Sequence, residues 1–343
     1  MSEVKIGKKL IITLTSGMYE DSRFVFREYI QNSADQIDQA IKGKLLTPEQ
    51  ANIIIDIDKA NRSIRFFDNA TGIESSKVKK ILGDVADSEK SGIDTKGFIG
   101  IGRLGGLAYC DKLQFSTSYI GENTKTIMTW DAKKLHDLIN DPSVDDDAAH
   151  VIQQVFDIHT EIAEADDHFF EVEMFSVHKS NNALLEIESV REYLSMVAPV
   201  PYDCAFYFGN KIKSYMSDHN YPKLSEYCII INGEQLFKAY RKNIYRVVGM
   251  NKEVCDEIHD IGFKEIKLSN GDVAAWLWFG ISKFETQINK LGNIQRGLRL
   301  RCKNIQIGDD STLISKKFFK EDRGTHYFVG EIHVVHPDIK PNS

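Results

Sequence analysis

One helical stretch organises this chain, Arg27-Glu28-Tyr29-Ile30-Gln31-Asn32-Ser33-Ala34-Asp35. It lies within a pattern that predicts a helix from about Asp21 to Ala40, with Asp21 or Ser22 as the expected capping residue. The apolar side chains recur at helical spacing and form one face of this helix: Phe26, Ile30, Ala34 and Ile37.

The opposite face of the same helix is polar. Glu28, Asn32 and Asp35 fall within about 60° of one another, because each residue turns the helix by about 100°. Two interpretations are open for this face. It is either a solvated surface, or a carboxylate and an amide point together into a pocket. In the second case the carboxylate acts as a base toward water, and the amide oxygen is a ligand for Mg²⁺.

Composition describes an ordinary globular protein. The 343 residues provide for about two domains, and 42% are hydrophobic and 27% charged. No run approaches the roughly 18 apolar residues of a membrane span, and the apolar run near Lys5 to Leu14 is too short for a secretory signal. Because neither a membrane span nor a signal is seen, we expect no membrane association. The net charge of −7 disfavours nucleic-acid binding by the whole molecule, although a local basic face remains possible.

The cysteines point to a reducing compartment. There are five, an odd number, and no two form a CxxC pair: Cys110, Cys204, Cys228, Cys255 and Cys302. This scattered pattern favours free thiols in the cytoplasm and argues against a structural zinc site.

A predicted hairpin follows the first helix. Two apolar runs, Asn52 to Ile57 and Ser63 to Phe67, are separated by a polar turn. The second run ends directly on Asp68-Asn69-Ala70-Thr71-Gly72-Ile73. A carboxylate at a strand end beside a glycine turn is either a functional group or plain turn chemistry, and both remain open. A short helix is predicted from Ser75 to Gly83.

A glycine-rich segment comes next. Asp84 to Lys96 is polar and weakly periodic, as in a mobile loop. It leads into Gly97-Phe98-Ile99-Gly100-Ile101-Gly102-Arg103-Leu104-Gly105-Gly106, whose backbone amides are able to approach phosphates. Leu107 to Cys110 is expected to open a helix there. A Rossmann motif is excluded because no hydrophobic strand precedes the glycines, and the P-loop and protein-kinase signatures are absent.

The remaining pattern is mixed. We predict helices at Ser189 to Val197 and Lys252 to Ile261, with a domain boundary at Pro199 to Pro201. Predicted strands are Lys9 to Thr15, Lys112 to Tyr119, Thr124 to Trp130, Phe169 to Val177, Tyr227 to Asn232, Ala274 to Ile281, Gly297 to Cys302 and Gly330 to Val335. Alternation at Gly297 to Cys302 places the leucines inward and Arg299 and Arg301 outward. His333 and His336 have no metal-site spacing and are expected to be structural.

Taken in order, Glu28/Asn32, Asp68/Gly72 and Gly100/Gly102/Gly105 make the chain resemble the GHKL ATPases: gyrase, the ninety-kilodalton heat-shock chaperone, histidine kinases and MutL. The resemblance extends over about residues 10 to 343, and the second half is most similar to the chaperone's middle domain at Gly297 to Ile307 and Val335 to Ser343. It implies an α+β protein, with a two-layer α/β sandwich ATPase domain (the Bergerat fold) at residues 1–200. A smaller α/β transducer or middle-type domain is implied at 201–343, truncated at its C-terminal end.

The resemblance assigns roles residue by residue. Glu28 matches the general base, Asn32 the Mg²⁺ ligand, and Asp35 an acidic residue that supports the nucleotide site. Asp68 matches the carboxylate that accepts a hydrogen bond from the adenine amine. Gly72 matches the glycine that lets the backbone pass close to the base.

The same resemblance makes Gly100, Gly102 and Gly105 the phosphate loop and Asp84 to Lys96 the ATP lid. Further nucleotide contacts are expected at Ile73, Lys96, Gly97, Ile101, Arg103 and Leu104. Two departures from the family pattern stand out: Ala70 replaces a usual glycine, and the strand Phe169 to Val177 lacks the threonine often found near the adenine.

The implied function is an ATP-driven conformational switch. ATP and Mg²⁺ bind, the lid closes, two copies form a homodimer, and a protein client is clamped while ATP is hydrolysed to ADP and phosphate. One alternative is a nucleotide-sensing scaffold with little turnover, which the presence of Glu28 disfavours. A MutL- or topoisomerase-like enzyme would need a basic DNA face at Arg296, Arg299, Arg301 and Lys303, where a solvated strand face is the competing interpretation. A histidine kinase is a further alternative, and it is disfavoured because this sequence has no recognisable phosphoacceptor helix before the expected ATPase domain.

The end of the chain also carries an expectation. In the chaperone, the segment that Val335 to Ser343 resembles leads to an arginine that reaches the γ-phosphate. We therefore expect this chain to be the N-terminal part of a longer protein, with slow hydrolysis on its own. Arg296, Arg299 or Lys290 would be the substitutes for that arginine.

Overall fold

The computed structural model describes residues 8, 21–83, 102–143, 147–283, 286–309, 312–314, 319, 321 and 323–339. The chain divides into two compact units, one of residues 1–191 and 227–235 and the other of residues 192–226 and 236–343. The predicted α+β class is confirmed, since sheet and helices form the first unit and further sheets form the second. Within the described ranges, no helix has the length and apolar character that a bilayer span requires.

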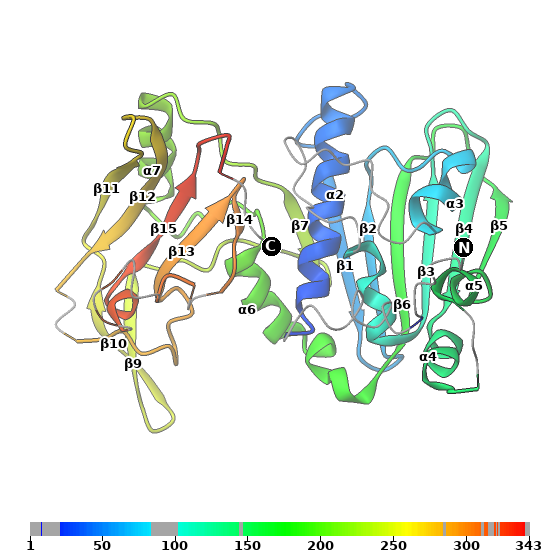
Figure 1. Cartoon of the computed structure of the whole chain (residues 1–343). Coiled ribbons are helices and arrows are strands. Elements are labelled where there is room, and N and C mark those ends of the chain that lie inside the picture. The colour runs from blue at the N-terminus through cyan, green and yellow to red at the C-terminus, as the bar shows by residue number, and fades with distance from the viewer. Residues whose placement is uncertain are drawn as a thin grey trace. The chain divides into compact units, whose positions relative to one another are not determined.

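An eight-stranded sheet is the centre of the first unit, in the order β5-β4-β3-β6-β2-β1-β7-β8 (Figure 1). Neighbouring strands run antiparallel, except β1 and β7, which are parallel. The strands are β1 (Asn52–Asp58), β2 (Ser63–Asp68), β3 (Cys110–Ser118), β4 (Thr124–Asp131), β5 (Phe156–Ile162), β6 (Phe169–Val177), β7 (Cys228–Ile231) and β8 (Glu234–Gln235). The helices are α2 (Phe24–Lys42), α3 (Ser75–Gly83), η1 (Gly102–Ala108), α4 (Ala132–Asn140), α5 (Ala148–Gln153), η2 (Lys179–Leu185) and α6 (Ile187–Val197), the last of which continues into the second unit.

The hydrophobic alternation of the β1–β2 hairpin explains its place under α2. Every second residue of both strands is buried, which gives the sheet one apolar face. From α2, Phe26 and Tyr29 pack on Phe66 of β2, with ring centroids 5.2 and 4.7 Å apart. This contact fixes the polar face of α2 relative to the end of β2.

Two local predictions in this unit are wrong. The helix begins at Phe24, and neither Asp21 nor Ser22 caps it: Asp21 Oδ1 instead accepts the backbone N–H of Arg23, the N-cap residue, at 3.0 Å. No helix opens at Leu107, because the 3₁₀ helix η1 ends at Ala108 and Cys110 already belongs to β3. The predicted strand at Lys9 to Thr15 and the predicted mobile loop at Asp84 to Lys96 lie outside the described residues.

The second unit contains a five-stranded sheet in the order β11-β12-β15-β13-β14 and a separate β9–β10 hairpin. Buried apolar clusters cover both faces of the larger sheet, because alternate residues of β12 enter different clusters. The elements are α7 (Gly209–Asp218), β9 (Asn243–Val248), β10 (Asn251–Glu257), β11 (Asp260–Lys267), β12 (Val273–Ile281), β13 (Gly297–Cys302), β14 (Ile305–Gln306), η3 (Gly324–Tyr327) and β15 (Val329–Val334).

The helix predicted at Lys252 to Ile261 is wrong. This segment is strand β10, followed by the start of β11, and β10 pairs with β9 in an antiparallel hairpin. Gly249 adopts a positive φ of 63° in the connection, which a glycine accommodates without strain. Pairing with β9 therefore decides the structure of this segment.

The outward placement of the two arginines of β13 is also wrong. Arg299 is 6% exposed and Arg301 is fully buried. Strand β13 runs parallel to β15, with Arg299 opposite Glu331, and Glu331 forms an ion pair with Arg301. Neither a DNA-binding face nor a solvated strand face is available at these two positions.

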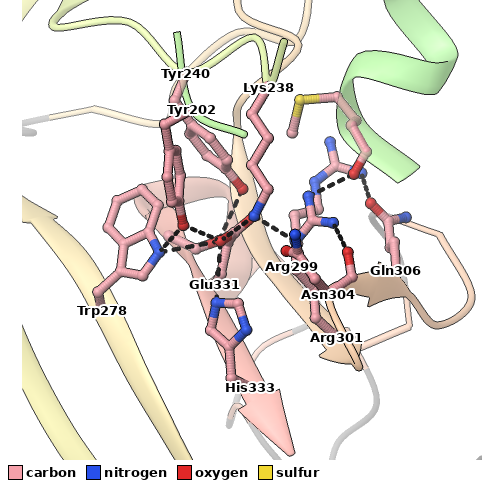
Figure 2. Close-up of polar contacts among 12 residues, drawn as sticks. Tyr202, Lys238, Tyr240, Trp278, Arg299, Arg301, Asn304, Gln306, Glu331 and His333 are labelled. Atoms are coloured by element: carbon pink, nitrogen blue, oxygen red, sulfur yellow. Dashed lines mark hydrogen bonds and ion pairs between the residues drawn. The ribbon is translucent and has the colours of Figure 1, made fainter. Parts of the chain in front are cut away.

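Glu331 is the centre of a buried polar cluster (Figure 2). Lys238 Nζ lies 3.1 and 3.0 Å from its two oxygens, Trp278 Nε1 donates at 3.2 Å, and the Tyr202 hydroxyl also donates to it. His333 Nε2 donates to Glu331 at 3.1 Å, so His333 has the structural role that its spacing predicted. One carboxylate thus joins several segments of the second unit.

Candidate functional site

The first part of the candidate site is the polar face of α2. Glu28 and Asn32 are both partly exposed and lie one turn apart, whereas Asp35 is 4% exposed. Gly102 lies directly against Glu28: a Cβ atom added to Gly102 would be 2.0 Å from Glu28 Oε2. Only glycine allows the backbone of η1 to approach this carboxylate so closely. The structure thus brings Glu28 together with the first residue of η1.

The second part is the carboxyl group of Asp68, at the end of β2. Its side chain is 1% exposed, and Oδ1 accepts the backbone N–H of Ala70 at 3.1 Å. Burial raises the pKa of Asp68 to about 7, although the Ser33 hydroxyl on α2 and the Ala70 amide act to lower it. Among the residues the structure describes, Asp68 Oδ2 is buried and has no hydrogen-bond partner. A buried acceptor in this state fits a ligand that supplies an N–H donor.

The turn after Asp68 is held tightly against β3 and β6. Gly72 has a φ of 67°, and a Cβ atom there would lie 1.8 Å from the carbonyl oxygen of Ser118. The next amide, that of Ile73, donates to Thr117 Oγ1 at 2.9 Å, and this hydroxyl donates to the Phe169 carbonyl at 2.9 Å. A side chain at position 72 would therefore push the turn away from the sheet.

Three residues of this site were missed by sequence reasoning. Strand β6 carries no threonine, as noted, but Thr117 of β3 pairs with Phe170 and reaches the same turn. His168 Nδ1 lies 2.7 Å from the carbonyl oxygen of Ala70, and Ser33 approaches Asp68 from α2. No local pattern marks these residues, because sheet order and helix packing bring them to the turn. The methyl group of Ala70 is fully buried, so the turn accommodates it without glycine.

The third part is the segment at η1. Of the residues predicted to bind phosphate, Gly102, Arg103, Leu104 and Gly105 are described, whereas 96, 97, 100 and 101 lie outside the described residues. The Leu104 side chain is 2% exposed and belongs to the core. The Tyr29 hydroxyl of α2 donates to the Arg103 carbonyl at 3.2 Å and accepts the Gly106 amide at 3.1 Å. The 3₁₀ helix η1 is therefore attached to the helix that carries Glu28.

Sequence comparison with known proteins matches the part of the chain that contains these residues. Residues 19–160 match the family model described as "Histidine kinase-, DNA gyrase B-, and HSP90-like ATPase". Three similar curated proteins are each named "Chaperone protein HtpG". That of Coxiella burnetii is 28% identical over 143 residues, which cover 36% of this chain and 23% of the relative. That of Fusobacterium nucleatum is 28% identical over 129 residues (32% and 21%), and that of Buchnera aphidicola is 28% identical over 151 residues (38% and 24%).

The chain thus spans about a quarter of the length of these relatives. The matched region begins before α2 and ends within β5, so it contains Glu28, Asn32, Asp68, Gly72 and Gly102. Glu28 and Asn32 lie on α2, Asp68 ends β2, Gly72 follows in the turn, and Gly102 begins η1. Residues 19–160 of this chain are therefore similar in sequence to the histidine kinase-, DNA gyrase B- and HSP90-like ATPases, and they form a mixed sheet-and-helix fold.

Proposed function

We propose that this chain binds ATP together with Mg²⁺ and hydrolyses it to ADP and phosphate. The observation that carries the proposal is the unpartnered, buried Oδ2 of Asp68 at the turn beside Gly72. An ionised carboxylate accepts hydrogen bonds but cannot donate them, so it favours a purine with an exocyclic amine over one with a carbonyl at the same position. This chemistry selects adenine over hypoxanthine or guanine.

The hydrolytic role is assigned to Glu28. Its carboxylate lies beside the Gly102 backbone, where η1 begins, and it remains partly exposed to water. From this position Glu28 would orient a water molecule and accept its proton. Asn32, one helical turn further along the same face, is the residue that would hold Mg²⁺, which needs few protein oxygens. The bound metal would supply positive charge to the phosphate oxygens.

The wider role that we propose is a chaperone-like conformational switch, in keeping with the name of the HtpG relatives. Residues 84–96 would close over the nucleotide, two copies would associate when ATP is bound, and a cytoplasmic protein would be the client. The ATPase and transducer roles would be divided between residues 1–200 and 201–343. A protein client is preferred to DNA because Arg299 and Arg301, which would form a basic face, are buried.

The test is hydrolysis by Glu28→Gln, which keeps the shape of the side chain. Turnover is expected to fall by about 10²–10⁴-fold with nucleotide affinity retained, since a positioned general base contributes about this much. Glu74→Gln is the control, because the carboxylate of Glu74 forms a surface ion pair with Lys77. Turnover by Glu28→Gln at the parent rate would refute the assignment. A parent chain that binds ATP without turnover would favour the nucleotide-sensing scaffold.

A further inference from the structure

Tyr29 follows Glu28 on α2, and its side chain is 3% exposed. Its hydroxyl donates to the Arg103 carbonyl at 3.2 Å and accepts from the Gly106 amide at 3.1 Å. These two backbone groups are separated by three residues, as are the partners of a 3₁₀ hydrogen bond. One hydroxyl from α2 thus holds both ends of a single turn of η1.

The position of this hydroxyl is tightly constrained. The Tyr29 ring packs on Phe66 of β2, with centroids 4.7 Å apart. On its other side, a Cβ atom added to Gly106 would lie 2.6 Å from the hydroxyl and 2.9 Å from Leu113 Cδ1. A residue larger than glycine at position 106 would displace the hydroxyl or the turn. The core therefore fixes the ring, and the close approach of Gly106 fixes the contact.

The hydroxyl also stays neutral at physiological pH. Burial raises the pKa of Tyr29 far above its ordinary value, and the nearby Cys110 thiol and the Glu28 carboxylate act in the same direction. A neutral hydroxyl donates and accepts at the same time, which both contacts with η1 require. Phenylalanine would keep the ring but would provide neither contact.

We propose that Tyr29 is a positioning residue that sets the distance between the Glu28 carboxylate and η1. This proposal rests on the proposed ATPase function. Glu28 and Tyr29 are consecutive residues on one rigid helix. Gly102 of η1 lies against Glu28, and the next residue of η1, Arg103, accepts the hydrogen bond from the Tyr29 hydroxyl. Displacing a catalytic group by about 1 Å can lower turnover by about 10²-fold, so this attachment governs the rate. The proposed adenine-binding residue Asp68 lies on β2, so adenine binding does not depend on the contact between Tyr29 and η1.

The test compares Tyr29→Phe with Tyr227→Phe. Tyr227 is also buried, and its hydroxyl donates to Asp38 on the same helix at 2.6 Å, about three turns from Glu28. Each variant removes one tyrosine hydroxyl that forms hydrogen bonds at α2. Only Tyr29→Phe removes hydrogen bonds to η1. Adenosine affinity is measured by calorimetry, and ATP turnover is expressed per adenosine-binding site, which removes the effect of partial unfolding.

For Tyr29→Phe we expect turnover to fall by about 10–100-fold, with adenosine affinity within about twofold of the parent. Tyr227→Phe should match the parent in both measurements. In a Glu28→Gln background, Tyr29→Phe should have little further effect on turnover, because it acts through the placement of Glu28.

Parent-like turnover of Tyr29→Phe, or an equal loss in Tyr227→Phe, would overturn the positioning role and leave the proposed ATPase function intact. An additive loss in the Glu28→Gln background would also overturn it. A parent chain that binds adenosine without hydrolysing ATP would overturn the proposed hydrolysis and the inference with it.

Discussion

Lys238→Met should change how the stability of the second unit depends on pH. Lys238 is fully buried, and its ammonium lies 3.0 and 3.1 Å from the two oxygens of Glu331 (Figure 2). Burial lowers the pKa of Lys238 from 10.5 to about 7, and the charge of Arg301, which shares the same carboxylate, adds to this effect. Methionine preserves the length and the apolar stem of the side chain while removing the titrating group.

The sign and size of the effect follow from the two pKa values. Between pH 7 and 10.5 the unfolded chain holds a proton on Lys238 that the folded chain has released. The free energy of unfolding therefore rises with pH in this window, by up to about 1.4 kcal/mol per pH unit and about 5 kcal/mol in total. Lys238→Met lacks this contribution. Glu331 keeps Arg301, Tyr202, Trp278 and His333 as partners in that variant, so the fold should persist.

Urea unfolding followed by tryptophan fluorescence at pH 7.5, 8.5 and 9.5 measures the effect. Trp276 and Trp278 lie in the second unit, and a Trp130→Phe background removes the tryptophan of the first unit. The charge of Lys238 also affects Glu331 and His333. Burial holds the pKa of His333 at about 4, and nearby positive charges hold the pKa of Glu331 well below its ordinary value although burial acts to raise it, so neither group titrates between pH 7.5 and 9.5. The difference between the two slopes therefore reports on Lys238. The parent should have the steeper rise with pH. Equal slopes in the two proteins would refute the reasoning.

Two further predictions concern the candidate site. Adenosine affinity should weaken about tenfold from pH 8 to pH 6, because the Asp68 carboxyl, with a pKa of about 7, must be ionised to accept the amine; an equal pH dependence in Asp68→Asn, measured by calorimetry, would argue against this. Gly72→Ala should abolish adenosine binding, since its methyl would lie 1.8 Å from the Ser118 carbonyl oxygen. Gly121→Ala is the control, with a similar positive φ but no atom within 4 Å, and should bind adenosine normally; equal behaviour of the two alanine variants would contradict the close approach.

Local pattern was sufficient for α2 and the β1–β2 hairpin, but it did not predict the 3₁₀ helix η1. The apolar periodicity of α2 and the alternation of β1 and β2 are decided by burial against each other, and both appear in sequence. The strand end before a glycine turn left the role of Asp68 open between a functional group and plain turn chemistry, and the family resemblance gave it the adenine role. Thr117 and His168 could not be identified in this way, since only the pairing of β3 with β6 brings them to that turn.

The second unit was less predictable, for a physical reason. Alternation at Gly297 to Cys302 correctly indicated a strand, but both faces of its sheet are covered, so no face is outward. Arg301 is buried because Glu331, thirty residues later in the chain, supplies its carboxylate. The strand β10 was mistaken for a helix because its partner β9 decides its structure. Tertiary pairing overrides local propensity in each case.

The central claim is that Asp68 recognises the exocyclic amine of adenine. Calorimetric titration of the parent and Asp68→Asn with adenosine and with inosine tests it most directly, because inosine presents a carbonyl oxygen where adenosine presents the amine. The parent should bind adenosine at least about tenfold more tightly than inosine, since a carbonyl facing a buried carboxylate leaves both acceptors unpaired. In Asp68→Asn this preference should be lost, because an amide is able to donate to the carbonyl. Equal affinity of the parent for the two nucleosides, or an unchanged preference in Asp68→Asn, would contradict the claim.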